Sequence, residues 1–130
     1  MIYYSYLCDM KIFLDDKRFL HEARFPSSIN KEGWTIVRTY NEFVRIIDNN
    51  FDEIEIVAFD HDIACWDSNG NEQTGRTAQL YLEKYCLDND KKFPNWIVHT
   101  DNTNGRDNII GGILSYLRSV EDMDITNFRY

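Results

Sequence analysis

Short apolar runs alternate with segments of helical periodicity along this chain of 130 residues. The apolar runs predict four strands, and the third is continuous rather than alternating, as is typical of a strand covered on both faces. Apolar positions that recur at spacings of three and four predict three helices. The predicted strands are 11–14, 34–38, 53–59 and 96–99. The predicted helices are 39–49, 74–87 and a last one that follows Gly105 and contains 109–120.

Residues 19–33, between the first two strands, contain Pro26 and little helical periodicity, so we expect an irregular crossover with at most one helical turn. A loop with strong turn residues is expected at 62–76. The order of the elements indicates an α/β fold, a three-layer sandwich around a short, mostly parallel sheet of four strands. We expect residues 10–130 to form this single domain and residues 1–9 to precede it as an N-terminal extension.

Polar residues end or follow three of the four predicted strands. They are Asp15–Arg18, Asp60–Asp62 and His99–Asn102. Ligands of a parallel α/β sheet bind outside the carboxyl ends of its strands, and in a flavodoxin-like strand order the first and third strands flank the topological switch point. The three clusters are therefore expected to converge on one crevice.

The composition favours a packed globular protein over a disordered or membrane-spanning one. Hydrophobic residues make up 43% of the chain, yet no apolar stretch is long enough to cross a bilayer. The three cysteines are widely spaced and fit neither a disulfide framework nor a zinc motif, so a reducing, cytoplasmic setting is expected. A net charge of −8 argues against general binding of duplex DNA. A divalent cation at the acidic strand ends would still admit an anionic phosphate ligand.

The adjacent carboxylates of Asp15 and Asp16 form the sharpest of the acidic clusters. Two carboxylates at the end of a buried strand repel each other, and their arrangement becomes favourable when they share a hard cation. Asp60, at the end of the neighbouring strand, supplies a third oxygen ligand. We therefore expect these three residues to bind Mg²⁺ or another divalent cation. The alternative is that one aspartate caps a turn while the other is solvated.

Two of the three histidines, His61 and His99, stand at converging strand ends. Imidazoles that oppose each other across a phosphate can act as general base and general acid near neutral pH. Together with Asp60 they form the predicted catalytic set. The alternative is that a histidine orients an aspartate or binds the substrate.

Four further residues are predicted to bind the phosphate. They are Arg18, Thr100, Asn102 and Arg106. The arginines offer a fork-like grip, and the second stands at the start of the last helix, where backbone N–H groups favour an anion. Arg18 could instead pair with Asp16, and the hydroxyl and amide of the other two could instead close turns.

Several motifs of phosphate binding and nucleophilic catalysis are absent from the sequence. Neither GxxxxGK[ST] nor GxGxxG occurs, and no serine stands in a nucleophile-elbow pattern. Their absence argues against the corresponding nucleotide hydrolysis, dinucleotide binding and serine-hydrolase chemistry. The Gly75-Arg76-Thr77 stretch is predicted to begin a helix, and Arg76 belongs either to the site or to the surface.

Taken together, these stretches resemble the cyclic-phosphate-processing receiver-like domains, which are divergent relatives of response-regulator receivers. Members of this family carry an LDD-x-R stretch, an LDHD stretch, a TG that opens a helix and an HS-x-N-x-x-G segment. The matching stretches lie in the same order within about residues 10–118. They are Leu14-Asp15-Asp16-Lys17-Arg18, Phe59-Asp60-His61-Asp62, Thr74-Gly75-Arg76, and His99-Thr100-Asp101-Asn102 with Gly105-Arg106. The resemblance implies a CheY-like sandwich that binds or processes cyclic phosphates, at RNA ends or in cyclic nucleotides.

The resemblance also implies roles for individual residues. Those that match the acidic pocket of a receiver are Asp15, Asp16 and Asp60. Those that match positions special to the cyclic-phosphate group are Arg18, His61, Asp62, His99, Asn102 and Arg106. Thr100 stands where the family usually has serine, and it keeps the hydroxyl.

Three parts of a phosphorylatable receiver are missing here, namely its first helix, its fifth strand and its terminal lysine. Ordinary phosphotransfer signalling is therefore not expected. We expect a metal-assisted phosphoesterase, a hydrolase that acts on a cyclic or terminal phosphate of a small molecule or an RNA end. The alternatives are a non-catalytic domain that binds a phosphorylated ligand or a protein, and a degenerate receiver in which Asp60 accepts the phosphoryl group.

Overall fold

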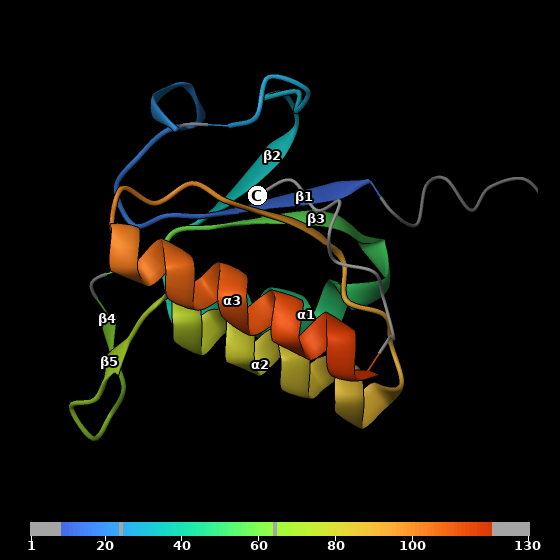
Figure 1. Cartoon of the computed structure of the whole chain (residues 1–130). Coiled ribbons are helices and arrows are strands. Elements are labelled where there is room, and N and C mark those ends of the chain that lie inside the picture. Colours follow the sequence, from blue (N-terminus) through green and yellow to red (C-terminus); the bar gives the residue numbers. More distant parts are fainter. Residues whose placement is uncertain (1–8, 24, 64, 121–130) are drawn as a thin grey trace, which may run out of the picture.

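A parallel sheet of four strands forms the centre of the protein (Figure 1). The computed structural model describes residues 9–23, 25–63 and 65–120. The strands stand in the order β2-β1-β3-β6, and each neighbouring pair is parallel. Their bounds are Met10–Leu14 for β1, Trp34–Val37 for β2, Ile54–Phe59 for β3 and Asn95–Val98 for β6. The predicted strands and the flavodoxin-like order, with β1 and β3 at the centre, are thus confirmed.

Three α-helices pack on one face of this sheet (Figure 1). The helices are α1 (Tyr40–Asn50), α2 (Gly75–Asn89) and α3 (Thr103–Val120), with short 3₁₀ turns η2 (Leu20–Glu22) and η3 (Phe51–Glu53). The first two α-helices begin at threonine caps, because the hydroxyl oxygens of Thr39 and Thr74 accept hydrogen bonds from backbone N–H groups of the first turn. These caps begin each helix where the sequence predicts it.

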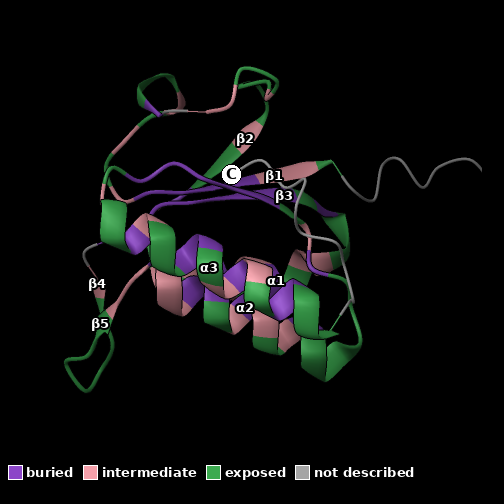
Figure 2. Ribbon diagram, viewed as in Figure 1, coloured by how far each residue is buried: buried purple, intermediate pink, exposed green. Residues whose placement is uncertain are grey.

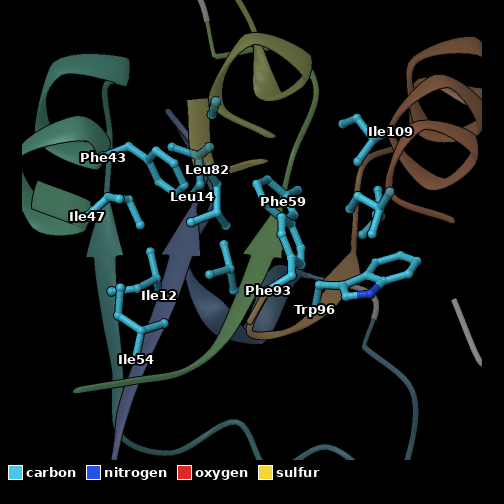
Figure 3. Close-up of a cluster of buried hydrophobic side chains, with 14 of the residues drawn as sticks. Ile12, Leu14, Phe43, Ile47, Ile54, Phe59, Leu82, Phe93, Trp96 and Ile109 are labelled. Atoms are coloured by element: carbon cyan, nitrogen blue, oxygen red, sulfur yellow. The ribbon is translucent and has the colours of Figure 1, made fainter. Parts of the chain in front are cut away.

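The main hydrophobic core lies between the sheet and the three helices. Figure 2 shows the buried residues gathered in the sheet and on the inner sides of the helices. Leu14 of β1 and Phe59 of β3 meet Phe43 and Ile47 of α1 there, and all four side chains are completely buried (Figure 3). Burying a side chain of this size contributes about 1.5–3 kcal/mol. This packing holds the carboxyl ends of β1 and β3 side by side.

The opposite face of the sheet is covered by the crossover between β1 and β2. Phe25 and Ile29 of the crossover pack against Phe13 of β1 and Ile97 of β6. The crossover contains a single 3₁₀ turn, Leu20–Glu22, which agrees with the prediction of an irregular segment with at most one helical turn. The crossover thus forms the third layer of the sandwich, and it leaves the sheet directly at the first acidic cluster.

The sequence predicts a loop with strong turn residues at 62–76, between β3 and α2, and this prediction is incomplete. The loop contains a small antiparallel hairpin of β4 (Cys65–Trp66) and β5 (Glu72–Gln73). Asp67 closes the turn between them, because its Oδ1 accepts two backbone N–H groups at 2.9 Å each. The turn residues are visible in the sequence, but strands of two residues are too short to show a period.

Residues 1–8 of the predicted N-terminal extension lie outside the described residues, so the extension stays a prediction. Among the described helices, none has both the length and the apolar character needed to cross a membrane.

Candidate functional site

The backbone hydrogen bonds of the sheet continue one residue beyond three strands and align their first polar residues. Asp15 N donates to Val37 O at 3.0 Å, Asp60 N to Leu14 O at 3.1 Å, and His99 N to Phe59 O at 2.9 Å. The three side chains therefore stand next to one another at the carboxyl edge of the sheet. This is the convergence that the parallel arrangement predicts.

Asp15, Asp60 and His99 form a buried group whose ligand atoms all lie within 4.8 Å of one another. Their exposed fractions are 1%, 5% and 2%. The sequence predicts Asp16 as the third member of this group, but the third member in the structure is His99. Asp16 is half-buried beside the group and does not belong to it.

Asp15 is held as a carboxylate by three hydrogen bonds. Burial raises its pKa, but hydrogen bonds from the His99 side chain and from backbone N–H groups outweigh burial and lower the pKa to about 2. The ring Nε2 of His99 lies 3.1 Å from Oδ2. The backbone N–H groups of Lys17 and Arg18 donate to Oδ1 at 2.9 and 2.8 Å. Through these last two bonds Asp15 also caps a turn, which is the alternative role predicted for one aspartate of the pair.

Asp60 lies in an environment that disfavours its charge. Burial raises its pKa, and the nearby charge of Asp15 adds to this, against hydrogen bonds from the Thr100 hydroxyl and from His61 N. The sheet therefore holds one carboxylate that is ionised and a second that resists ionisation. A divalent cation fits this donor set, because two close carboxylates offer hard oxygen ligands and the cation would offset their repulsion.

His99 is a fully enclosed ring rather than an exposed one. It stacks on Phe13, with ring centroids 4.5 Å apart and planes inclined by 16°. Its Nδ1 is buried and has no hydrogen-bond partner among the described residues. A neutral imidazole that donates from Nε2 to Asp15 leaves Nδ1 as an acceptor, which is cheaper to bury than an unpaired donor. The geometry thus favours the alternative in which His99 orients an aspartate.

His61 forms a second group with Asp62 and Asn102. Nδ1 of His61 lies 2.8 Å from Oδ1 of Asp62. The side-chain amide of Asn102 donates to both carboxylate oxygens of Asp62, at 3.3 and 3.2 Å, while its Oδ1 accepts Gly105 N–H at 2.8 Å. Because a backbone N–H can only donate, this last bond fixes which end of the amide faces Asp62. Hydrogen bonds from His61 and Asn102 lower the pKa of Asp62 against the opposing effect of burial.

Gly105 makes room for the His61 ring. A Cβ at this position would lie 2.3 Å from Cγ of His61, far inside van der Waals contact. The imidazole therefore rests directly on the first turn of α3. The ring is held by this backbone and by Asp62, and the backbone N–H of His61 donates to Oδ1 of Asp60 at 2.8 Å.

Arg18 spans the two outer strand ends of the site. Its guanidinium donates to Asp101 at 2.7 Å and to the carbonyl of His99 at 3.2 Å, and it lies 3.5 Å from Oδ2 of Asp15. Its acidic partners are thus Asp15 and Asp101, not Asp16 as the alternative suggested. With 25% of its side chain exposed, Arg18 still faces solvent at the rim of the site.

The remaining predicted ligands occupy different positions. Thr100 bonds to Asp60 and accepts Asn102 N–H at 3.2 Å, so its hydroxyl lies inside the site and also closes a turn. Arg106 is half-buried in the first turn of α3. Arg76 lies away from these residues, between α2 and α3, where it bonds to Gln79 at 2.7 Å. Of the two alternatives for Arg76, the structure does not support the site, and the side chain is half-buried between the two helices.

Arg38 is a residue of the site that the sequence analysis missed. It follows β2 directly, and its guanidinium donates to the backbone carbonyls of Asp15 and Arg18 at 3.0 and 2.6 Å. Its position at a strand end is the same signal that identified the other three clusters. It went unnoticed because only one charged residue stands there.

Fold and site together define a receiver-like α/β domain with an acidic pocket at the carboxyl edge of a parallel sheet. The family model described as the cyclic-phosphate processing receiver domain matches residues 10–115. The chain therefore belongs to this family, as its motifs predict. Comparison with curated proteins and with solved structures gave no match.

Proposed function

We propose that this domain is a metal-assisted phosphoesterase that opens or removes a cyclic or terminal phosphate. The observation that carries the proposal is that a carboxylate pair suited to a cation lies next to an imidazole that is oriented for proton transfer. A buried carboxylate pair, Asp15 and Asp60, suits a cation, and the next residue, His61, is oriented by its own carboxylate, Asp62. Phosphate ester hydrolysis needs both charge stabilisation and proton transfer.

The carboxylates of Asp15 and Asp60 would hold the cation, while Asp16, the residue after Asp15, lies outside the buried group. When bound, a divalent cation polarises phosphoryl oxygens and neutralises their charge. Arg18 and Arg106 would hold the remaining phosphate oxygens through charge-assisted hydrogen bonds. His99 keeps Asp15 oriented from the buried side.

His61 is the group that moves the proton. Because Nδ1–H donates to Asp62, the neutral ring carries its lone pair on Nε2. Nε2 takes a proton from water as the water oxygen bonds to phosphorus. The phosphorus–oxygen bond of the ring or ester then breaks, and the leaving oxygen receives that proton from His61.

The test is turnover of a panel of nucleoside 2′,3′-cyclic phosphates, with Mg²⁺ and with a chelator. We expect monophosphate product that depends on the cation and falls about 100-fold or more in His61→Gln. Asp67→Asn, in the hairpin turn, is the control outside the site. Tight binding without product would favour the non-catalytic alternative. Labelling by acetyl phosphate that disappears in Asp60→Asn would favour the degenerate receiver.

Asn102→Asp separates the two tasks of this side chain. The carboxylate keeps the acceptor for Gly105 N–H, so α3 stays capped and the free energy of unfolding should change by no more than about 0.5 kcal/mol. The amide donor to Asp62 is lost and a like charge takes its place. We therefore expect kcat to fall about 10- to 100-fold, as for other residues that orient a catalytic group.

The matched control for this variant is Asn104→Asp, which makes the same charge change at an exposed position two residues further on. It should leave kcat unchanged. The ¹⁵N shifts of the His61 ring report its tautomer directly, and they should move in Asn102→Asp alone. An unchanged kcat together with an unchanged tautomer in Asn102→Asp would contradict the positioning role.

A further inference from the structure

Phe19 is an exposed aromatic residue beside the site, with 55% of its surface accessible. Single exposed apolar residues are common and need no function. Phe19 differs because its backbone is held in place. Its N–H donates to the Glu22 side chain at 2.9 Å and its carbonyl accepts Glu22 N–H at 3.0 Å, so the residue caps the 3₁₀ turn of the crossover.

A guanidinium group ties the Phe19 ring to the site. The guanidinium carbon of Arg38 lies 5.2 Å from the ring centroid, a cation–π contact. The same guanidinium donates to the carbonyls of Asp15 and Arg18. Arg38 therefore links the Phe19 ring, through the cation–π contact, to the backbone of Asp15 and Arg18 at the end of β1.

Three basic residues lie near Phe19 in a chain that is acidic overall. Lys17 and Arg18 precede Phe19 in the sequence and Arg38 lies over its ring, beside the one carboxylate of Glu22 that accepts its N–H, whereas the chain carries a net charge of −8. The His21 ring lies nearly parallel to the Phe19 ring, at 5° and 6.1 Å between centroids, and widens the aromatic surface. Aromatic rings flanked by arginines are the arrangement on which proteins stack unpaired nucleobases.

We propose that Phe19 is a stacking platform for the nucleobase of the ligand whose phosphate lies at the acidic site. This inference rests on the proposed function and narrows it, because the substrate class becomes a nucleotide or the terminal nucleotide of an RNA. Stacking accepts any base, since every base presents a π-face. The platform therefore supplies affinity for a nucleoside without selecting its sequence.

The test compares two probes that differ only in the base. They are adenosine 2′,3′-cyclic phosphate and 1-O-methylribose 2,3-cyclic phosphate, each titrated into the full chain with Mg²⁺ and followed by NMR. Phe19→Ala should weaken binding of the adenosine compound about tenfold or more and leave the base-free compound unchanged. Phe19→Leu keeps apolar bulk without a π-face and should behave like Phe19→Ala, while Phe19→Trp should restore binding.

Trp66→Ala is the matched control, because Trp66 is the other strongly exposed aromatic side chain in the described residues and lies on the hairpin. It should change neither affinity. Equal binding of the two probes by the wild type, or no effect of Phe19→Ala, would overturn the stacking platform and leave the phosphoesterase proposal intact. Binding of neither probe would overturn both.

Discussion

Gly75→Ala is expected to destabilise the protein by about 3 kcal/mol, the largest loss from adding one methyl group in this fold. A Cβ on Gly75 would lie 1.7 Å from the carbonyl oxygen of Asp60 and 2.7 Å from its carbonyl carbon. These are backbone atoms at the end of β3, so no side-chain rotation relieves the clash. The hydrogen bond from Gly75 N to His61 O, 2.7 Å long, would be broken as α2 moves away.

The matched control for this substitution is Gly111→Ala. Gly111 is exposed on α3, and a Cβ there meets nothing within 4 Å. Because alanine is a better helix former than glycine, this variant should gain about 0.5–1 kcal/mol. Urea unfolding measures the free energy of unfolding of both variants. A loss below about 1 kcal/mol in Gly75→Ala would mean that α2 can shift without cost, and the Asp60 strand end would then be less constrained than the structure indicates.

The convergence of the acidic and imidazole clusters could be predicted from the sequence because it depends only on topology. Once the apolar runs are parallel strands, their carboxyl ends must share one edge. The partners within the site could not be predicted in the same way. Arg18 bonds to Asp101, 83 positions further on, and such a contact depends on the twist of the sheet rather than on any local spacing.

The different roles of chemically identical residues could not be predicted from the sequence either. Asp15 and Asp16 are chemically identical, and only the backbone beyond β1 decides that the first enters the buried group. His99 and His61 both stand at strand ends. The ring of His99 is buried and stacks on Phe13, whereas the ring of His61 is half-exposed and lies against Gly105 of α3. Burial and orientation of this kind arise from packing of distant elements, which sequence spacing does not encode.

Asp60→Asn is expected to be more stable than the wild type in the absence of a divalent cation and less stable than the wild type in its presence. In chelator at neutral pH the variant should be more stable by about 1 kcal/mol, because it removes a buried carboxylate whose ionisation is opposed by burial and by Asp15. An asparagine oxygen can still accept His61 N–H. Functional sites commonly hold such unfavourable charge, since the bound ligand compensates for it.

A divalent cation should stabilise only the wild type. At a concentration one hundred times its dissociation constant, a ligand specific to the folded state adds about 2.7 kcal/mol, which exceeds the gain from the substitution. Asp60→Asn lacks the second carboxylate, so its melting temperature should not respond, and its turnover should be lost with the cation. Glu55→Gln, on the exposed part of β3, is the control and should respond to the cation like the wild type.

The pH dependence in chelator distinguishes this cause from a loss of packing. The pKa of Asp60 is raised in the folded state, so above the unfolded value of 3.8 the folded protein binds more protons than the unfolded chain, and stability falls as pH rises through the folded pKa. Asp15 acts in the opposite direction between about 2 and 3.8, where stability rises with pH. The fall above 3.8 should disappear in Asp60→Asn, and the rise below it should remain. If Asp60→Asn and the wild type show the same dependence of stability on pH, Asp60 and Asp15 do not share the buried charge that the proposed cation site requires.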